Sequence, residues 1–252
     1  MEDFKDLLEF DDMQMYFCDD YKITDDIVLK SPTIGDIIEF GEKKYYSIVY
    51  SLTCIPSDMK SQLFDKGIDW NKIEDFNLFI LLTRGMTAED TKLTFDNLDL
   101  SSFEIAQNTK TGEAYLYKTK EDGTEIVIDS LVYEQIVGYL RKLHGIVPKK
   151  ERAFDKYTKE ILIDEDRHKI ELNKKKPYKS QLMGLISAMS RFPGFPYKRG
   201  ELKECGLYEF MDRVHGAQIF ISTTALLGGM YSGMIDTSKI NKNEFNWMRS
   251  LD

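Results

Sequence analysis

The sequence predicts a mainly α fold, a helical bundle with a small antiparallel β-meander (α+β). Apolar residues recur at helical spacing through most of the 252 residues. Between about residues 100 and 129 this periodicity changes to alternation, and tight turns separate three short segments. Hydrophobic residues make up 42% of the chain, which is enough for a packed core. We expect an N-terminal helical region (1–96), a β-meander with a covering helix (97–148), a charged helical connector (149–177) and a C-terminal helical region (178–252).

The first region reads as short helices separated by glycine and proline. Ser31 and Pro32 form a start signal, because serine caps a helix and proline suits its first turn. Gly41 is a natural stop. Four apolar stripes follow helical spacing and are expected to face the core: Ile34, Ile37 and Ile38; Tyr45, Ile48, Val49 and Leu52; Met59, Leu63 and Phe64; Ile73, Phe76, Phe79, Ile80 and Leu81.

The meander is predicted from three alternating segments at 103–108, 113–118 and 125–129. Gly112 and Gly123 lie in the turns between them. A three-stranded sheet needs cover on one face, and the helical stripe of 130–143 is the expected cover. Gly145 and Pro148 should end that helix.

The connector is dense in charge and carries a helical stripe of Phe154, Tyr157, Ile161 and Leu162. It predicts a solvated amphipathic helix or a lever between two parts, with Pro177 as a boundary. A helix is expected at 180–190. Residues 191–200 cannot be helical, because Pro193, Gly194 and Pro196 interrupt them. One long helix or two stacked helices are expected over 207–235, and a short one over 241–251.

The segment 216–235 contains no charged residue in a chain that is 31% charged. It could cross a membrane, form a buried helix or face another protein. Its glutamine, serine, threonine and glycine content argues against a bilayer span. We expect a buried helix, part of whose surface meets a partner, with these core residues: Ile219, Ile221, Leu226, Leu227, Met230 and Ile235.

Composition narrows the function classes. The net charge of −9 disfavours a nucleic-acid ligand, because an acidic surface repels phosphate. Cys18, Cys54 and Cys205 are far apart in sequence and are expected to be free thiols in a reducing compartment. The acidic N-terminus lacks a secretory signal, so a cytoplasmic protein is expected.

Catalytic motifs are absent from the sequence: there is no phosphate-binding glycine loop, zinc-protease helix or nucleophile elbow. We therefore expect neither an enzyme nor a cofactor. The alternative is a metal-dependent hydrolase that uses Asp164, Asp166 and His168. Helical spacing also relates Glu209, Asp212 and His215, either as an acid/base group or as the last solvated turn before the uncharged segment. His144 is expected at a helix C-terminus, where the helix dipole favours it.

Candidate protein-contact residues lie in the last region. Phe192, Phe195 and Tyr197 are on a proline-glycine loop, where they could anchor a partner or pack against their own core. Gly229 and Gly233 are four residues apart, so one helix face there would admit another backbone, within the domain or between subunits.

Two stretches carry a family resemblance: 31–82, which begins SPTIGDIIEFGEKKYYSIVY, and 207–251, which begins LYEFMDRVHGAQIFISTTALLGGMYSG. They resemble a family encoded among the morphogenesis genes of tailed bacteriophages and prophages of Gram-positive bacteria. The resemblance implies a virion structural or assembly protein, such as a tail assembly chaperone or a baseplate-associated protein. It implies other viral structural proteins, or further copies of the chain, as partners, and a location in the host cytoplasm during assembly or in the virion. It carries over no functional residue.

Overall fold

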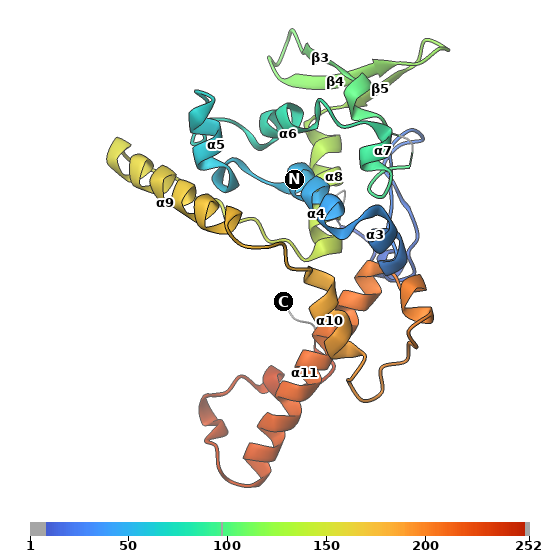
Figure 1. Cartoon of the computed structure of the whole chain (residues 1–252), viewed down its shortest axis with the longest axis vertical. Helices are drawn as coiled ribbons and strands as arrows, with labels where there is room; N and C mark the ends of the chain where they lie inside the picture. Colours follow the sequence, from blue (N-terminus) through green and yellow to red (C-terminus); the bar gives the residue numbers. More distant parts are fainter. Residues whose placement is uncertain (1–8, 97, 250–252) are drawn as a thin grey trace.

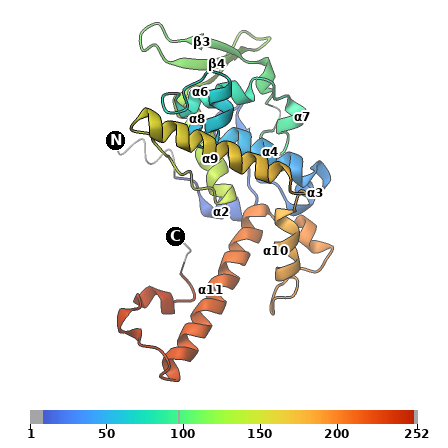
Figure 2. The same cartoon turned by 60° about the vertical axis from the view of Figure 1, so that its left-hand side comes forward.

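The computed structural model describes residues 9–96 and 98–249. The expected boundary at residue 97 and the last two residues of the helix expected over 241–251 lie outside the described residues. Within them that helix is wrong, because only a 3-10 turn, Lys242–Phe245, is formed there. Within them the chain forms ten α-helices and two small antiparallel sheets, so the predicted mainly α fold with a β-meander is confirmed. Figures 1 and 2 show a body with the meander at one end and a long helix projecting from the other.

The N-terminal half of the body is made of short helices. They are α2 (Asp12–Tyr16), α3 (Ile34–Phe40), α4 (Glu42–Thr53), α5 (Lys60–Asp65), α6 (Asp75–Thr83) and α7 (Ala88–Thr91). A hairpin of β1 (Tyr21–Lys22) and β2 (Val28–Leu29) precedes α3, and the sequence analysis missed it because two-residue strands are too short to show alternation.

The meander is β3 (Glu104–Gln107), β4 (Ala114–Thr119) and β5 (Glu125–Ile128), paired in the order β3-β4-β5. Its strands and turns lie where the alternating pattern placed them. Helix α8 (Ser130–His144) follows, with Asp129 as its N-cap and Gly145 in a left-handed C-cap. Leu116 and Ile128 point from the sheet into the core shared with α8, as predicted for a covering helix.

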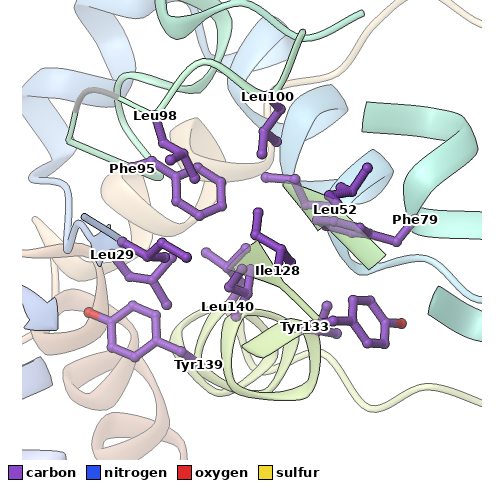
Figure 3. Packing of buried hydrophobic residues seen from close by; sticks show 14 of the residues in the cluster. Leu29, Leu52, Phe79, Phe95, Leu98, Leu100, Ile128, Tyr133, Tyr139 and Leu140 are labelled. Carbon is purple, nitrogen blue, oxygen red and sulfur yellow. The ribbon is translucent and has the colours of Figure 1, made fainter. Parts of the chain in front are cut away.

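The main hydrophobic core lies between the meander, α8, α4 and α6 (Figure 3). Ile128 and Leu140 are fully buried at its centre, and Phe95 and Tyr139 close one side. Each such side chain contributes about 1.5–3 kcal/mol when it leaves water. The predicted stripe of Tyr45, Ile48, Val49 and Leu52 is buried throughout.

Two smaller clusters extend the core. One joins α3 and α4 to α10 (Gln181–Met189) and to the first turns of α11 (Leu207–Tyr231). The other joins α5 and α6 to α9 (Lys156–Lys174). The expected helices at 180–190 and in the connector are therefore present, and residues 191–200 are non-helical as predicted.

Several local expectations are wrong. Thr33, and not Ser31, caps α3, because Thr33 and Asp36 bond reciprocally to each other's backbone. Ile38, Phe64 and Leu81 are about half exposed, since their helices bury only one face. In the connector the buried residue is Ile163, with Leu162 packed beside it. The rest of the expected stripe faces solvent: Phe154 is 97% exposed, Tyr157 74% and Ile161 40%. Charged residues surround the stripe on α9, so the sequence did not indicate which face of α9 would contact α5.

Candidate protein interface

The root of α11 is fixed to the body by several contacts. Its first backbone amide, on Leu207, donates to Pro32 O at 3.0 Å, and Ile34 N donates back to Cys205 O at 2.9 Å. Gly206 is required here, because a Cβ would overlap the Cys18 thiol. Phe210 is completely buried among α3, α4 and α10. The first turns of α11 therefore belong to the core.

The second half of α11 leaves the body. The helix has 25 residues and extends about 38 Å at about 1.5 Å per residue. Thr223 is its last buried residue. Figures 1 and 2 show that the remainder, with the chain that folds back along it, projects beyond every other element. We call residues 216–249 the C-terminal arm.

Large apolar side chains of the C-terminal arm are exposed. They are Phe220, Ile221, Tyr231, Met234, Trp247 and Met248, with exposed fractions between 50% and 84%. The buried helix predicted for 216–235 is therefore wrong beyond Thr223. Of its expected core only Ile219 is buried, whereas Ile221 is 57% exposed and Leu226 is half-buried. An uncharged helix need not be buried, and here the segment extends past the body into solvent.

A clasp holds the returning chain on the helix. Thr223 Oγ1 donates to Glu244 O at 3.1 Å, and Arg249 Nη1 donates to the same carbonyl oxygen at 2.7 Å. The Arg249 side chain is only 10% exposed and pairs with the Glu244 carboxylate at 2.6 Å. The C-terminal arm is thus a built helix-and-return unit, although it buries little of its apolar surface.

The two candidate glycines serve this reversal. Gly233 lies outside the helix, in the left-handed conformation with φ 69°, and its N–H bonds to Met230 O. The Ile235 side chain of the returning chain packs directly against Gly229. The expected flat helix face shared by Gly229 and Gly233 is therefore wrong, because the helix ends at Tyr231 and the close approach occurs within the arm.

The aromatic loop packs partly against its own core. Phe192, Phe195 and Tyr197 are half-buried against the α10 and α11 cluster. The Tyr197 hydroxyl donates to Glu209 at 2.6 Å, and the Arg213 guanidinium lies over its ring. Phe192 meets Phe220 edge to face, with centroids 6.5 Å apart. The loop therefore borders the C-terminal arm, and Tyr197 is committed to an internal network.

Asp164 and Asp166 of the alternative metal site have separate structural roles, and His168 is exposed on α9. Asp166 accepts from Ser61 N at 2.9 Å and Ser61 Oγ at 2.6 Å, which attaches α9 to the first turn of α5. Asp164 bonds to Arg167, whose guanidinium also reaches Asp65. In the part of the chain that the structure describes, no three histidine, cysteine or acidic residues are grouped as metal ligands.

Of the three candidates at helical spacing on α11, Asp212 is exposed, His215 is half-buried and Glu209 is hydrogen-bonded to Tyr197 and Arg213. Burial opposes ionisation of Glu209, but hydrogen bonds from Tyr197 and Arg213 outweigh it and lower the Glu209 pKa. Burial lowers the pKa of His144 to about 4, and its Nε2 lies 2.8 Å from the Tyr45 hydroxyl. His144 does end α8, but it is neutral, so the expected charge–dipole stabilisation is wrong. The three cysteines are free thiols, as predicted.

None of the helices in the described residues has the length and apolar character needed to cross a bilayer. No protein-family model, curated protein or solved structure matches the chain.

Most of the exposed apolar residues of the C-terminal arm were not predicted from the sequence. Tyr231, Met234, Trp247 and Met248 were not singled out. The sequence did contain a usable signal: four glycines and several small polar residues dilute 216–235, which is unusual for the centre of a core. Only the placement of the body against the first half of α11 shows which residues remain outside.

Proposed function

We propose that this chain is a structural or assembly protein that acts through protein–protein contacts made by its C-terminal arm. The observation that carries the proposal is the projecting, charge-free end of α11 with its exposed aromatic and methionine side chains. Large exposed apolar patches on a folded protein mark surfaces that bind other molecules. Tryptophan, tyrosine and methionine are the residues that contribute most at such surfaces.

The candidate catalytic residues are engaged in structural hydrogen bonds, which argues against a role in catalysis. Asp166 attaches α9 to α5, and Glu209 attaches the aromatic loop to α11, each through short hydrogen bonds. A carboxylate committed in this way is a poor metal ligand or proton shuttle, because use in a reaction would break the contact it makes. We therefore propose no catalytic residue and no cofactor.

The specific role we propose is in the morphogenesis of a tailed bacteriophage, as a tail assembly chaperone or a baseplate component. The resemblance of 31–82 and 207–251 to that class supports it, and the second stretch contains the whole arm. The partners would be other viral structural proteins or further copies of the chain, met in the host cytoplasm or retained in the virion.

The test is affinity purification of the tagged protein from phage-producing cells, with mass spectrometry of both the purified complexes and the purified particles. Phe220→Ser and Trp247→Ser should remove the co-purifying structural proteins. Phe154→Ser is the matched control, because Phe154 is also an exposed aromatic residue but lies on the connector.

Presence in particles would assign a virion component, and presence only in lysate complexes would assign a transient chaperone. The proposal fails if no viral structural protein co-purifies, or if the arm variants and the Phe154→Ser control lose partners equally.

A further inference from the structure

The outer face of the meander is a second surface, remote in sequence from the C-terminal arm. Side chains alternate along β4, so Leu116 is buried whereas Tyr115 and Tyr117 lie on the opposite face. The two tyrosine rings are 6.1 Å apart between centroids. In Figures 1 and 2 the sheet lies at one end of the body, with helices on only one side of it. No segment that the structure describes therefore covers the tyrosine face.

Carboxylates surround this face. The register places Glu104 opposite Tyr117, and the Tyr117 hydroxyl donates to Glu104 at 2.7 Å. A shallow hollow of about 560 Å³ beside Tyr115 is lined by Val127 and by three acidic residues, Glu113, Glu125 and Asp129. No lysine or arginine is among the described residues that line it. The surface thus combines an aromatic floor with charge of one sign.

Some carboxylates of the chain have a counter-charge close by, whereas those of this face have none among the described residues. Asp26, for example, is paired with Lys120 at 2.8 Å. Lys118 shares the face of Leu116 by the alternation of β4. Within the described residues none of the four carboxylates, Glu104, Glu113, Glu125 and Asp129, forms an ion pair. Asp129 is partly committed, since it caps α8.

We propose that the outer face of the meander binds an extended, arginine-bearing segment of a partner protein. Arginine stacks on tyrosine rings and bonds to carboxylates through two parallel N–H groups, so one side chain uses both features of this face. Alternate residues of an extended chain are about 6.6 Å apart. That spacing matches the 6.1 Å between the Tyr115 and Tyr117 rings. An arginine at every second position would therefore place one guanidinium over each ring.

The same charges exclude other occupants of comparable chemistry. Nucleic-acid bases could stack on the tyrosines, but their phosphates would face the acidic rim without a single cation. The proposal concerns a different surface from the C-terminal arm, so it stands or falls independently of the proposed function.

The test measures binding of a fluorescein-labelled peptide of alternating arginine and serine to the full chain by fluorescence anisotropy. The control peptide has glutamate in place of arginine. We expect the Glu113→Gln/Glu125→Gln variant to bind the arginine peptide at least about tenfold more weakly. Tyr115→Thr, which keeps a strand-forming residue, should weaken it by a similar factor. Glu165→Gln/Glu171→Gln is the matched control, because it removes two exposed charges on α9, and it should bind as the wild type does.

Three results would overturn the proposal. One is equal weakening in the α9 control, which would show attraction by net charge alone. Another is full binding by Tyr115→Thr and Glu113→Gln/Glu125→Gln, each shown to be folded by circular dichroism. The third is self-association of the chain in sedimentation that Glu113→Gln/Glu125→Gln abolishes, which would assign the face to a second copy.

Discussion

Gly229 lies directly against Ile235, and a Cβ on Gly229 would be 3.1 Å from Ile235 Cδ1. The reversal at the tip of the C-terminal arm depends on this contact. Gly229→Leu should force the returning chain away from the helix at a cost of about 1–3 kcal/mol to the closed arm. The melting temperature should change little, because the arm is outside the core. Limited proteolysis should show faster cleavage within 232–249, and unchanged cleavage would contradict the prediction.

The clasp at Thr223 should hold the same segment from the other end. Thr223→Val is nearly isosteric but removes the hydroxyl that bonds Glu244 O. We expect the returning chain to open more often, with a loss of about 0.5–1.5 kcal/mol. Amide hydrogen exchange of residues 241–249 should speed up correspondingly, whereas amides of α8 should not change. Equal exchange in both proteins would show that Arg249 alone is sufficient.

Core and arm positions of α11 should respond differently to truncation. Phe210→Ala empties a fully buried site and should destabilise the chain by about 3–5 kcal/mol. Phe220→Ala lies where the ring is already half exposed, and it should cost less than about 1 kcal/mol. Urea unfolding of both variants measures the difference.

Leu226→Asp provides a sharper form of the same comparison. A buried helix would lose about 3 kcal/mol or more from this change. In the structure Leu226 is only half-buried, so the aspartate can reach water and the loss should be smaller. A cost of about 3 kcal/mol or more in urea unfolding would show that the second half of α11 is covered in solution.

Stability should fall in mild acid because of His144. Its pKa is about 4 in the folded chain and about 6.5 when the chain unfolds. Between these values the unfolded state binds a proton that the folded state does not bind. Above about pH 6.5 His144 is neutral in both states and does not lower the free energy of unfolding. As the pH falls towards 4, protonation of the unfolded state lowers that free energy by an amount on the order of 3 kcal/mol.

The check is the melting temperature against pH for the wild type and for His144→Gln, whose amide can still accept from Tyr45. The variant should show a shallower fall between pH 6.5 and 4. Nuclear magnetic resonance titration of the His144 ring gives a direct second measurement. An inflection near 6.5 in the folded protein would contradict the prediction.

The sequence by itself determined the elements whose patterns are local. The meander and α8 were predicted within a residue or two, because alternation, turn glycines, Asp129 and Gly145 each act within a few residues. The stripe of α4 was also predictable, since one helix face carries every apolar residue that the core buries. These features need no knowledge of what packs against them.

Only the tertiary structure decided which apolar surfaces are covered. The same type of apolar residue is buried at Phe210 and exposed at Phe220, ten positions later on one helix. The reason is the length of the body, whose hydrophobic cluster includes α11 only as far as Ala217, whereas the returning chain covers Thr223. Likewise Phe154 and Tyr157 are exposed and Ile163 is buried, because α5 meets α9 on one side only. Burial depends on contacts between distant segments, and no local pattern specifies where those contacts end.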